Sequence, residues 1–174
     1  MSDDCPVCKH ISIKSNLLYE DQKVAAFLSP SPSIAGHIVI APKQHVPILE
    51  QVPDFIVSEL FIKANKLSIA CFESLGAEGT NIIVQNGVAS GQTLPHVTVH
   101  IIPRKENDGL QLQWKPRQLS EEQMSTVELA VKEEAKKIGF FEKEKPKPIE
   151  VKKPEEIKPT KEENYLIKQL NRIP

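Results

Sequence analysis

The sequence lacks an excess of charge of either sign. Its 174 residues include 22 lysines and arginines against 23 aspartates and glutamates, for a formal net charge of −1. Such a balance creates no broad electrostatic field that would attract nucleic acid or an anionic membrane surface. We therefore expect neither nucleic acid nor a membrane among the partners.

Long apolar runs and an export signal are missing as well. No apolar stretch approaches the roughly 18 residues that mark a transmembrane helix. Asp3, Asp4 and Cys5 stand where a signal peptide would need positive charge followed by an apolar run. The three cysteines are an odd number, which argues against a disulfide framework. These absences predict a cytoplasmic protein whose cysteines serve as thiols or metal ligands.

The order of the elements that are present predicts an α+β domain. Alternating or continuous apolar residues indicate strands over residues 17–20, 23–28, 36–41, 81–85 and 96–102. Between the third and fourth strands, apolar residues three or four apart predict a helix that begins near Pro53 and ends at Gly76. Hairpin, strand, helix, strand, strand is the order of a mostly antiparallel sheet with the helix on one face. The run Ile82-Ile83-Val84 predicts a central position for its strand.

The chain changes character after this first domain, which we place at residues 1–115. Ser120 and Gln123 form a capping box, and the apolar spacing that follows predicts an extra helix within residues 116–140. Residues 141–160 are charged and rich in proline, as expected of a semi-rigid linker. A second capping box begins at Thr160, and residues 161–174 are predicted to form a short amphipathic helix that docks on its own domain or on a partner subunit.

The most informative stretch is His-Val-Thr-Val-His-Ile-Ile at residues 96–102. With the side-chain period of a strand, His96, Thr98 and His100 face one way and the apolar residues between them face the other. The prolines at positions 95 and 103 predict that the strand ends cleanly on both sides. Seven residues of this kind also suit an ordinary half-buried strand, so the neighbouring sequence decides the interpretation.

The neighbouring sequence resembles a known family. Residues 84–104 contain Gln85-Asn86-Gly87, then Gly91-Gln92-Thr93, then the 96–102 stretch. This segment resembles the signature of the histidine triad (HIT) superfamily, in which three histidines alternate with apolar residues. It is most similar to the branch that contains the fragile histidine triad protein. Residues 36–43 also match in sequence and distance, so the resemblance covers about residues 5–105.

The resemblance implies a fold and an activity. The fold is a HIT-like sheet of about five antiparallel strands with a main helix, usually paired into a homodimer with a continuous sheet. Here it would carry a C-terminal helical extension. The activity is binding of a purine nucleotide or nucleotide conjugate and attack on its α-phosphorus, as in hydrolysis of nucleoside phosphoramidates or dinucleotide polyphosphates. The middle histidine of the triad is the nucleophile, because imidazole is unprotonated at neutral pH and leaves well once phosphorylated and protonated.

The sequence departs from this pattern at two positions of the expected pocket. Thr98 occupies the nucleophile position, where a hydroxyl would need an adjacent base, for which His100 is the candidate. Ser29 stands where the family usually carries Asp or Asn to hold the ribose hydroxyls, and one hydroxyl cannot make the same two-pronged contact. These departures predict impaired or altered hydrolysis in a cavity that still fits a nucleotide.

Other residues match nucleotide-binding positions of the family. The resemblance implies that Gln85, Gly91, Gln92 and Thr93, together with His100, surround the α-phosphate. Either glutamine alone would equally suit a turn that only bonds itself. His37 is expected to position the ribose loop. The proline-rich loop 29–33 can form a polar rim for a ligand or serve as a plain connector.

Cys5 and Cys8 form a C-x-x-C pair, which is half of a zinc site. The resemblance to zinc-bearing prokaryotic HIT proteins implies that His45 and His96 complete it. Two thiolates and two imidazoles are a full tetrahedral set for a structural zinc ion. The alternative is a reduced thiol pair beside two unrelated histidines. His10 has no such match and is expected on the surface.

The sequence therefore supports a zinc-stabilised, purine-nucleotide-binding HIT protein with an impaired or altered active site. Two alternatives stay open. In one, the protein is an active nucleotidyl hydrolase with a rearranged site, completed by the C-terminal segment of the other subunit. In the other, the pocket is vestigial, and the protein is an interaction module that acts through its C-terminal tail.

Overall fold

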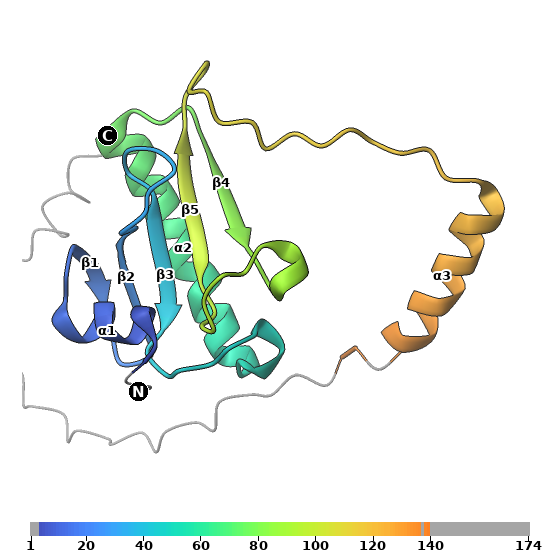
Figure 1. Cartoon of the computed structure of the whole chain (residues 1–174), viewed down its shortest axis with the longest axis horizontal. Helices are drawn as coiled ribbons and strands as arrows, with labels where there is room; N and C mark the ends of the chain where they lie inside the picture. The colour runs from blue at the N-terminus through green and yellow to red at the C-terminus, as the bar shows by residue number, and fades with distance from the viewer. Residues whose placement is uncertain (1–3, 137, 140–174) are drawn as a thin grey trace, which may run out of the picture. The chain divides into compact units, whose positions relative to one another are not determined.

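The computed structural model describes residues 4–136, 138 and 139. The linker predicted over 141–160 and the short helix predicted over 161–174 lie outside the described residues. Five antiparallel strands form one sheet (Figure 1). Their order across the sheet is β1 (Leu17–Glu20), β2 (Val24–Leu28), β3 (Ile38–Pro42), β5 (Val99–Arg104) and β4 (Gly79–Val84). The α+β class and the five-stranded antiparallel sheet are thus confirmed.

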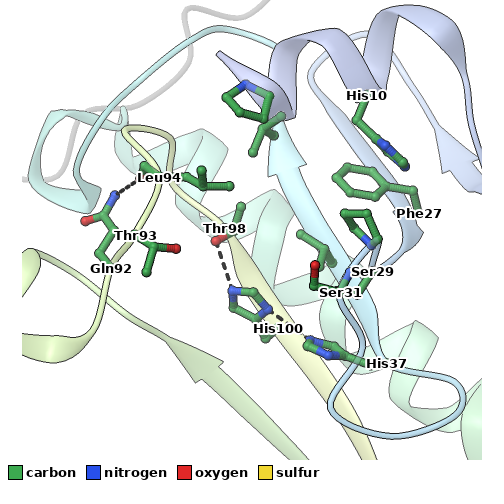
Figure 2. Close-up of a pocket in the computed structure, with 14 residues that line it drawn as sticks. His10, Phe27, Ser29, Ser31, His37, Gln92, Thr93, Leu94, Thr98 and His100 are labelled. Carbon is green, nitrogen blue, oxygen red and sulfur yellow. Dashed lines mark hydrogen bonds between the residues drawn. The ribbon is translucent and has the colours of Figure 1, made fainter.

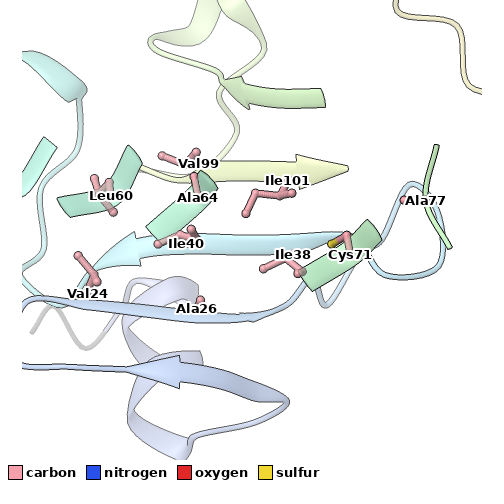
Figure 3. Packing of buried hydrophobic residues seen from close by; sticks show 10 residues of the cluster. All are labelled: Val24, Ala26, Ile38, Ile40, Leu60, Ala64, Cys71, Ala77, Val99 and Ile101. Atoms are coloured by element: carbon pink, nitrogen blue, oxygen red, sulfur yellow. The ribbon is translucent and has the colours of Figure 1, made fainter. Parts of the chain in front are cut away.

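The main helix, α2 (Asp54–Leu75), covers one face of the sheet. It ends at Gly76, whose φ of 59° lies in the left-handed region that favours glycine. Figure 3 shows the buried side chains between helix and sheet, among them Leu60 and Ala64 from α2 and Ile101 from β5. This packing fixes β5, so that residues pointing away from α2 are presented on the opposite face of the sheet.

A shorter helix, α1 (Pro6–Ile13), lies against that opposite face. The sequence did not predict it, because a C-x-x-C pair with a proline is typical of an irregular knuckle. Pro6 occupies the first turn, where its missing N–H costs nothing, and Lys14 ends the helix in the left-handed conformation. Val7 and Ile11 pack on Phe27 and its neighbours in the sheet.

The predicted central position of the fourth strand is wrong. β4 is an edge strand that pairs only with β5, and its Ile82 side chain is 41% exposed. A continuous apolar run does not distinguish a central strand from an edge strand whose side chains pack on one helix.

The predicted ends of the 96–102 strand also need correction, since β5 runs from Val99 through Pro103 to Arg104. The carbonyl of Arg104 accepts a hydrogen bond from the N–H of Glu78, so the Pro103 nitrogen faces the other side of the strand. Pairing with β3 has already ended there, at Ile38↔Ile101, and the proline therefore removes no ladder hydrogen bond.

The extra helix is α3 (Glu121–Ala135), and it begins with the predicted capping box of Ser120 and Gln123. None of its residues is buried, and the apolar side chains of Met124, Val127 and Val131 are all more than half exposed. Within the part of the chain that the structure describes, no helix is long and apolar enough to cross a membrane.

Candidate functional site

A cavity of about 490 Å³ opens on the sheet face that carries α1. This volume lies in the range of small-molecule sites. Its polar side chains come from α1, the 29–33 loop, the residue before β3, the chain leading into β5 and β5 itself (Figure 2): His10, Ser29, Ser31, His37, Gln92, Thr93, Thr98 and His100. Sequence-predicted residues that lie far apart along the chain are thus brought to one cavity, and the 29–33 loop forms part of its wall.

The direction of hydrogen bonding in this cavity is set by the backbone N–H of Ser33. It lies 3.2 Å from His37 Nδ1. A backbone N–H can only donate, so His37 Nδ1 carries no proton and accepts this hydrogen bond. The single proton of the neutral His37 ring therefore resides on Nε2.

The proton on His37 Nε2 in turn sets the hydrogen bonds of His100 and Thr98. His37 Nε2 lies 3.0 Å from His100 Nδ1, and with its proton it donates to that atom. The proton of a neutral His100 is consequently on Nε2, which lies 3.1 Å from Thr98 Oγ1. His100 thus donates to the threonine hydroxyl, and Figure 2 shows the three side chains in this row.

Burial keeps both imidazoles neutral. Desolvation, with a smaller contribution from the neighbouring His100, lowers the pKa of His37 from 6.5 to about 4. Desolvation also lowers the pKa of His100. Both rings are therefore uncharged near pH 7, as the proton assignments above require.

A second group of side chains, the metal-ligand cluster, comprises Cys5, Cys8, His45 and His96, whose ligand atoms all lie within 4.8 Å of one another. His96 Nδ1 lies 3.4 Å from Cys5 Sγ, 3.5 Å from Cys8 Sγ and 3.3 Å from His45 Nδ1. Tetrahedral zinc ligation with ordinary bond lengths places two nitrogens about 3.3 Å apart and a sulfur about 3.6 Å from a nitrogen. The spacing of these four residues therefore fits a tetrahedral ion.

The proton on His96 also fits metal binding. Its Nε2 lies 3.0 Å from the carbonyl oxygen of Pro42, which can only accept, so Nε2 carries the proton. The lone pair of Nδ1 then points at the two sulfur atoms and at His45, as in a ligating histidine whose other nitrogen is held by a backbone carbonyl. The four residues that the sequence singled out are brought together in a form that can bind a cation.

A family profile described as "HIT domain" matches residues 11–107. The chain belongs to the HIT domain family. Adenylylsulfatase HINT3 of Arabidopsis thaliana is 39% identical over 112 residues, which are 63% of this chain and 57% of that protein. The HIT domain chain thus spans little more than half the length of this relative.

Solved structures of the family resemble this HIT domain closely. A histidine triad nucleotide-binding protein from Candida albicans is 29% identical with a TM-score of 0.69, over 78% of this chain and all of that one. A zinc-bound histidine triad family protein from Mycobacterium smegmatis is 27% identical with a TM-score of 0.59, over 76% of this chain and 97% of that one.

Two expected phosphate residues of the HIT domain do not line the cavity. The side-chain amide of Gln85 donates to the carbonyl of Ser90, 3.3 Å away, and packs against Gly91. A Cβ at Gly91, where φ is 91°, would lie 2.6 Å from that amide, so glycine is required here. Contact of either residue with a nucleotide remains a prediction. The geometry is that of a turn that bonds itself.

Gln92 both lines the cavity and braces the loop. Its oxygen accepts from the N–H of Gly87 at 2.7 Å. Its nitrogen donates to the carbonyls of Pro47 and Leu94, at 2.7 and 2.8 Å. The amide is therefore already satisfied, and it supports the cavity wall before any ligand arrives.

His10 is not the surface residue that the sequence predicted. It lines the cavity from α1, and its ring centroid lies 4.4 Å from that of Phe27. The helical structure of residues 6–13 turns this side chain inward. Because the sequence gave no sign of that helix, the position of His10 could not be predicted.

The proton assignments predict a distinctive NMR titration. At pH 7, ¹⁵N spectra should show His37 and His100 neutral, each with its proton on Nε2, and His37 should titrate near pH 4. Because the folded pKa lies below the unfolded value of about 6.5, acid favours unfolding, and this histidine should cost about 2 kcal/mol of stability between pH 7 and pH 5. The variant His37→Gln should lose that share of the pH dependence. A His37 pKa above 6 would contradict the assignment.

Proposed function

We propose that this chain is a purine-nucleotide-binding HIT protein, related to nucleotidyl hydrolases and transferases that act at the α-phosphate, whose own hydrolytic activity is impaired. The observation that carries the proposal is the hydrogen bond from His100 Nε2 to Thr98 Oγ1. It supplies a preorganised donor in a cavity of nucleotide size, but no base for an attacking group. The names of relatives support the ligand class, since one is an adenylylsulfatase and another a nucleotide-binding protein.

Thr98 is poorly placed to act as a nucleophile. To attack phosphorus, its hydroxyl would have to give a proton to an unprotonated nitrogen. The nitrogen that Thr98 meets is His100 Nε2, which already carries a proton. Ser33 fixes the His37 proton on Nε2, and His37 donates it to His100 Nδ1, so the His100 proton must be on Nε2. A nucleotide phosphate oxygen, by contrast, can take the place of Thr98 as the acceptor for His100. This argues for binding and against the alternative of a rearranged active hydrolase.

We further propose that Cys5, Cys8, His45 and His96 hold a structural zinc ion. Their spacing and the lone pair of His96 support this assignment, and the zinc-bound relative supports the choice of metal. When bound, the ion would neutralise the two thiolates and fix the N-terminal helix. It would have no part in chemistry, because four protein ligands leave no open coordination position.

We propose the following division of the chain. Residues 1–115 form the nucleotide-binding unit and residues 116–140 carry the extra helix, while the predicted linker (141–160) and the predicted short helix (161–174) lie outside the described residues. The exposed apolar side chains of α3 support a role of the C-terminal part in contacts with other chains. That role is compatible with nucleotide binding and does not require a vestigial pocket.

A homodimer is proposed from two exposed features of the domain. The edge strand β4 has one side unpaired within the described residues, and α2 exposes Phe61, Ile62, Ile69 and Phe72. A two-fold contact through these elements would bury the apolar side chains and continue the sheet. Sedimentation equilibrium should give twice the chain mass, and Phe72→Glu should shift it towards the monomer. A wild-type protein that stays monomeric even at 100 times the concentration used in the sedimentation experiment would contradict this assembly.

The nucleotide proposal predicts opposite effects for two substitutions in the cavity. In calorimetric titrations with AMP, His100→Ala should weaken binding by about 10- to 100-fold, because a hydrogen bond to a charged phosphate contributes about 1.5–3 kcal/mol. Thr98→Val keeps the side-chain shape but removes the hydroxyl that competes for the same N–H. It should bind AMP at least as tightly as the wild type.

These two variants control for one another, since both alter the same pair of atoms. If the wild-type, metal-loaded protein gave no detectable heat with AMP, nucleotide binding would be ruled out. If Thr98→Val weakened AMP binding as much as His100→Ala, then Thr98 itself would be the ligand-binding group and the proton assignment would be wrong.

A further inference from the structure

The metal-ligand cluster and the nucleotide cavity share two segments of the chain. Along α1, Cys5 and Cys8 face the cluster, while Pro6, Val7 and His10 line the cavity. Along the chain that leads into β5, His96 belongs to the cluster, while Gln92, Thr93, Leu94 and Thr98 line the cavity. Two walls of the cavity therefore meet at Cys5, Cys8 and His96, and His45 completes the cluster from a third segment.

The second wall is not held by the sheet. Pairing of β5 with both neighbours begins only at Val99. Before that residue the backbone is held by single hydrogen bonds outside the strand ladder, including the long-range bond from Val97 N–H to Val46 O at 2.8 Å. The side chain of His96, only 1% exposed, is a main anchor of this segment through its Nε2–H bond to Pro42.

The first wall depends on side chains in a similar way. α1 meets the sheet through the apolar side chains of Val7 and Ile11 and through the buried cysteines. An eight-residue helix is only marginally stable by itself, so these contacts set its position.

Without a cation, only protons shared among the four side chains can satisfy the cluster. The protonated Nε2 of His96 leaves a lone pair on Nδ1, which lies 3.3 Å from the corresponding atom of His45 and close to two sulfurs. At most one shared proton can relieve each such contact. A cation at the centre satisfies all four groups together, and removing it favours separation of the segments that carry them.

We propose that Cys5, Cys8, His45 and His96 are positioning residues for the nucleotide cavity, so that metal binding and nucleotide binding are thermodynamically coupled. The inference rests on the proposed function, because it takes a nucleotide as the ligand. By holding one ion, the four residues fix the distance between α1 and the 92–98 segment. A nucleotide that contacts both walls binds best when that distance is fixed, and by linkage it strengthens metal binding by the same factor.

The test compares AMP affinity in zinc-loaded and zinc-stripped samples of the full-length protein by calorimetry under reducing conditions. Removing zinc should weaken AMP binding by about tenfold, within the usual range for coupled sites. Cys8→Ala should reproduce this loss in the presence of zinc. Cys71→Ala is the matched control, because it removes an equally buried cysteine in the α2 core and should leave AMP affinity unchanged.

A reciprocal measurement needs no metal-free protein. Saturating AMP should lower the equilibrium transfer of zinc from the wild-type protein to a chromogenic chelator by the same factor of about ten. In His100→Ala, at the same AMP concentration, the transfer should change far less. The zinc-transfer measurement tests the coupling even if circular dichroism shows that the zinc-stripped protein is unfolded.

The outcomes separate this inference from the proposed function. If zinc-loaded protein binds no AMP, both are overturned. If it binds AMP and the folded, stripped protein binds it within a factor of two, only the coupling is overturned. Failure of the wild-type protein to retain zinc, or zinc transfer that is insensitive to AMP, likewise overturns the coupling and leaves nucleotide binding intact.

Discussion

The hydrogen bond from the Ser33 N–H to His37 Nδ1 determines what the cavity can do. Because an amide can only donate, it forces the His37 proton to Nε2, which in turn forces the His100 proton to the nitrogen beside Thr98. The cavity is thereby given a neutral donor where a phosphate oxygen would lie, and Thr98 is denied a base. A loop connection on the rim of the sheet thus limits the chemistry available to Thr98 and His100.

His96, three residues before β5, is oriented by a backbone group of the opposite kind. The carbonyl of Pro42 accepts the proton of His96 Nε2, which frees Nδ1 towards Cys5, Cys8 and His45. Two histidines four residues apart therefore have opposite tasks. One presents a proton to the cavity, and the other presents a lone pair to a cation. Alternation along a strand brings both to one side, and local backbone groups decide the role of each.

Much of the fold could be predicted from the sequence. The sheet and α2 follow from apolar periodicity and from Gly76 at the helix end. The helical conformation of the C-x-x-C segment could not be predicted, because eight residues with a proline give too weak a periodic signal. The position of His10 was missed for the same reason. The edge position of β4 was missed because strand order depends on pairing between distant segments, which an apolar run does not encode.

The candidate site was predicted less evenly. The four cluster residues and the row of His37, Thr98 and His100 are brought together because motif order and strand alternation constrain them. The part played by Gln85 could not be predicted, since an amide beside a turn can bond a ligand or the turn itself, and here it bonds Ser90. The histidine tautomers could not be predicted either, because they depend on contacts with the backbone N–H of Ser33 and the backbone carbonyl of Pro42, which the sequence does not reveal.

We propose that the cavity binds an α-phosphate and that Thr98, in place of a histidine, leaves it without a competent nucleophile. The most direct test is the steady-state hydrolysis of an adenosine phosphoramidate by the wild-type protein and by Thr98→His. An imidazole at this position can attack and then leave, so turnover should rise at least 100-fold, about 2.7 kcal/mol in the barrier. Equal turnover by the two folded, AMP-binding proteins would contradict the account.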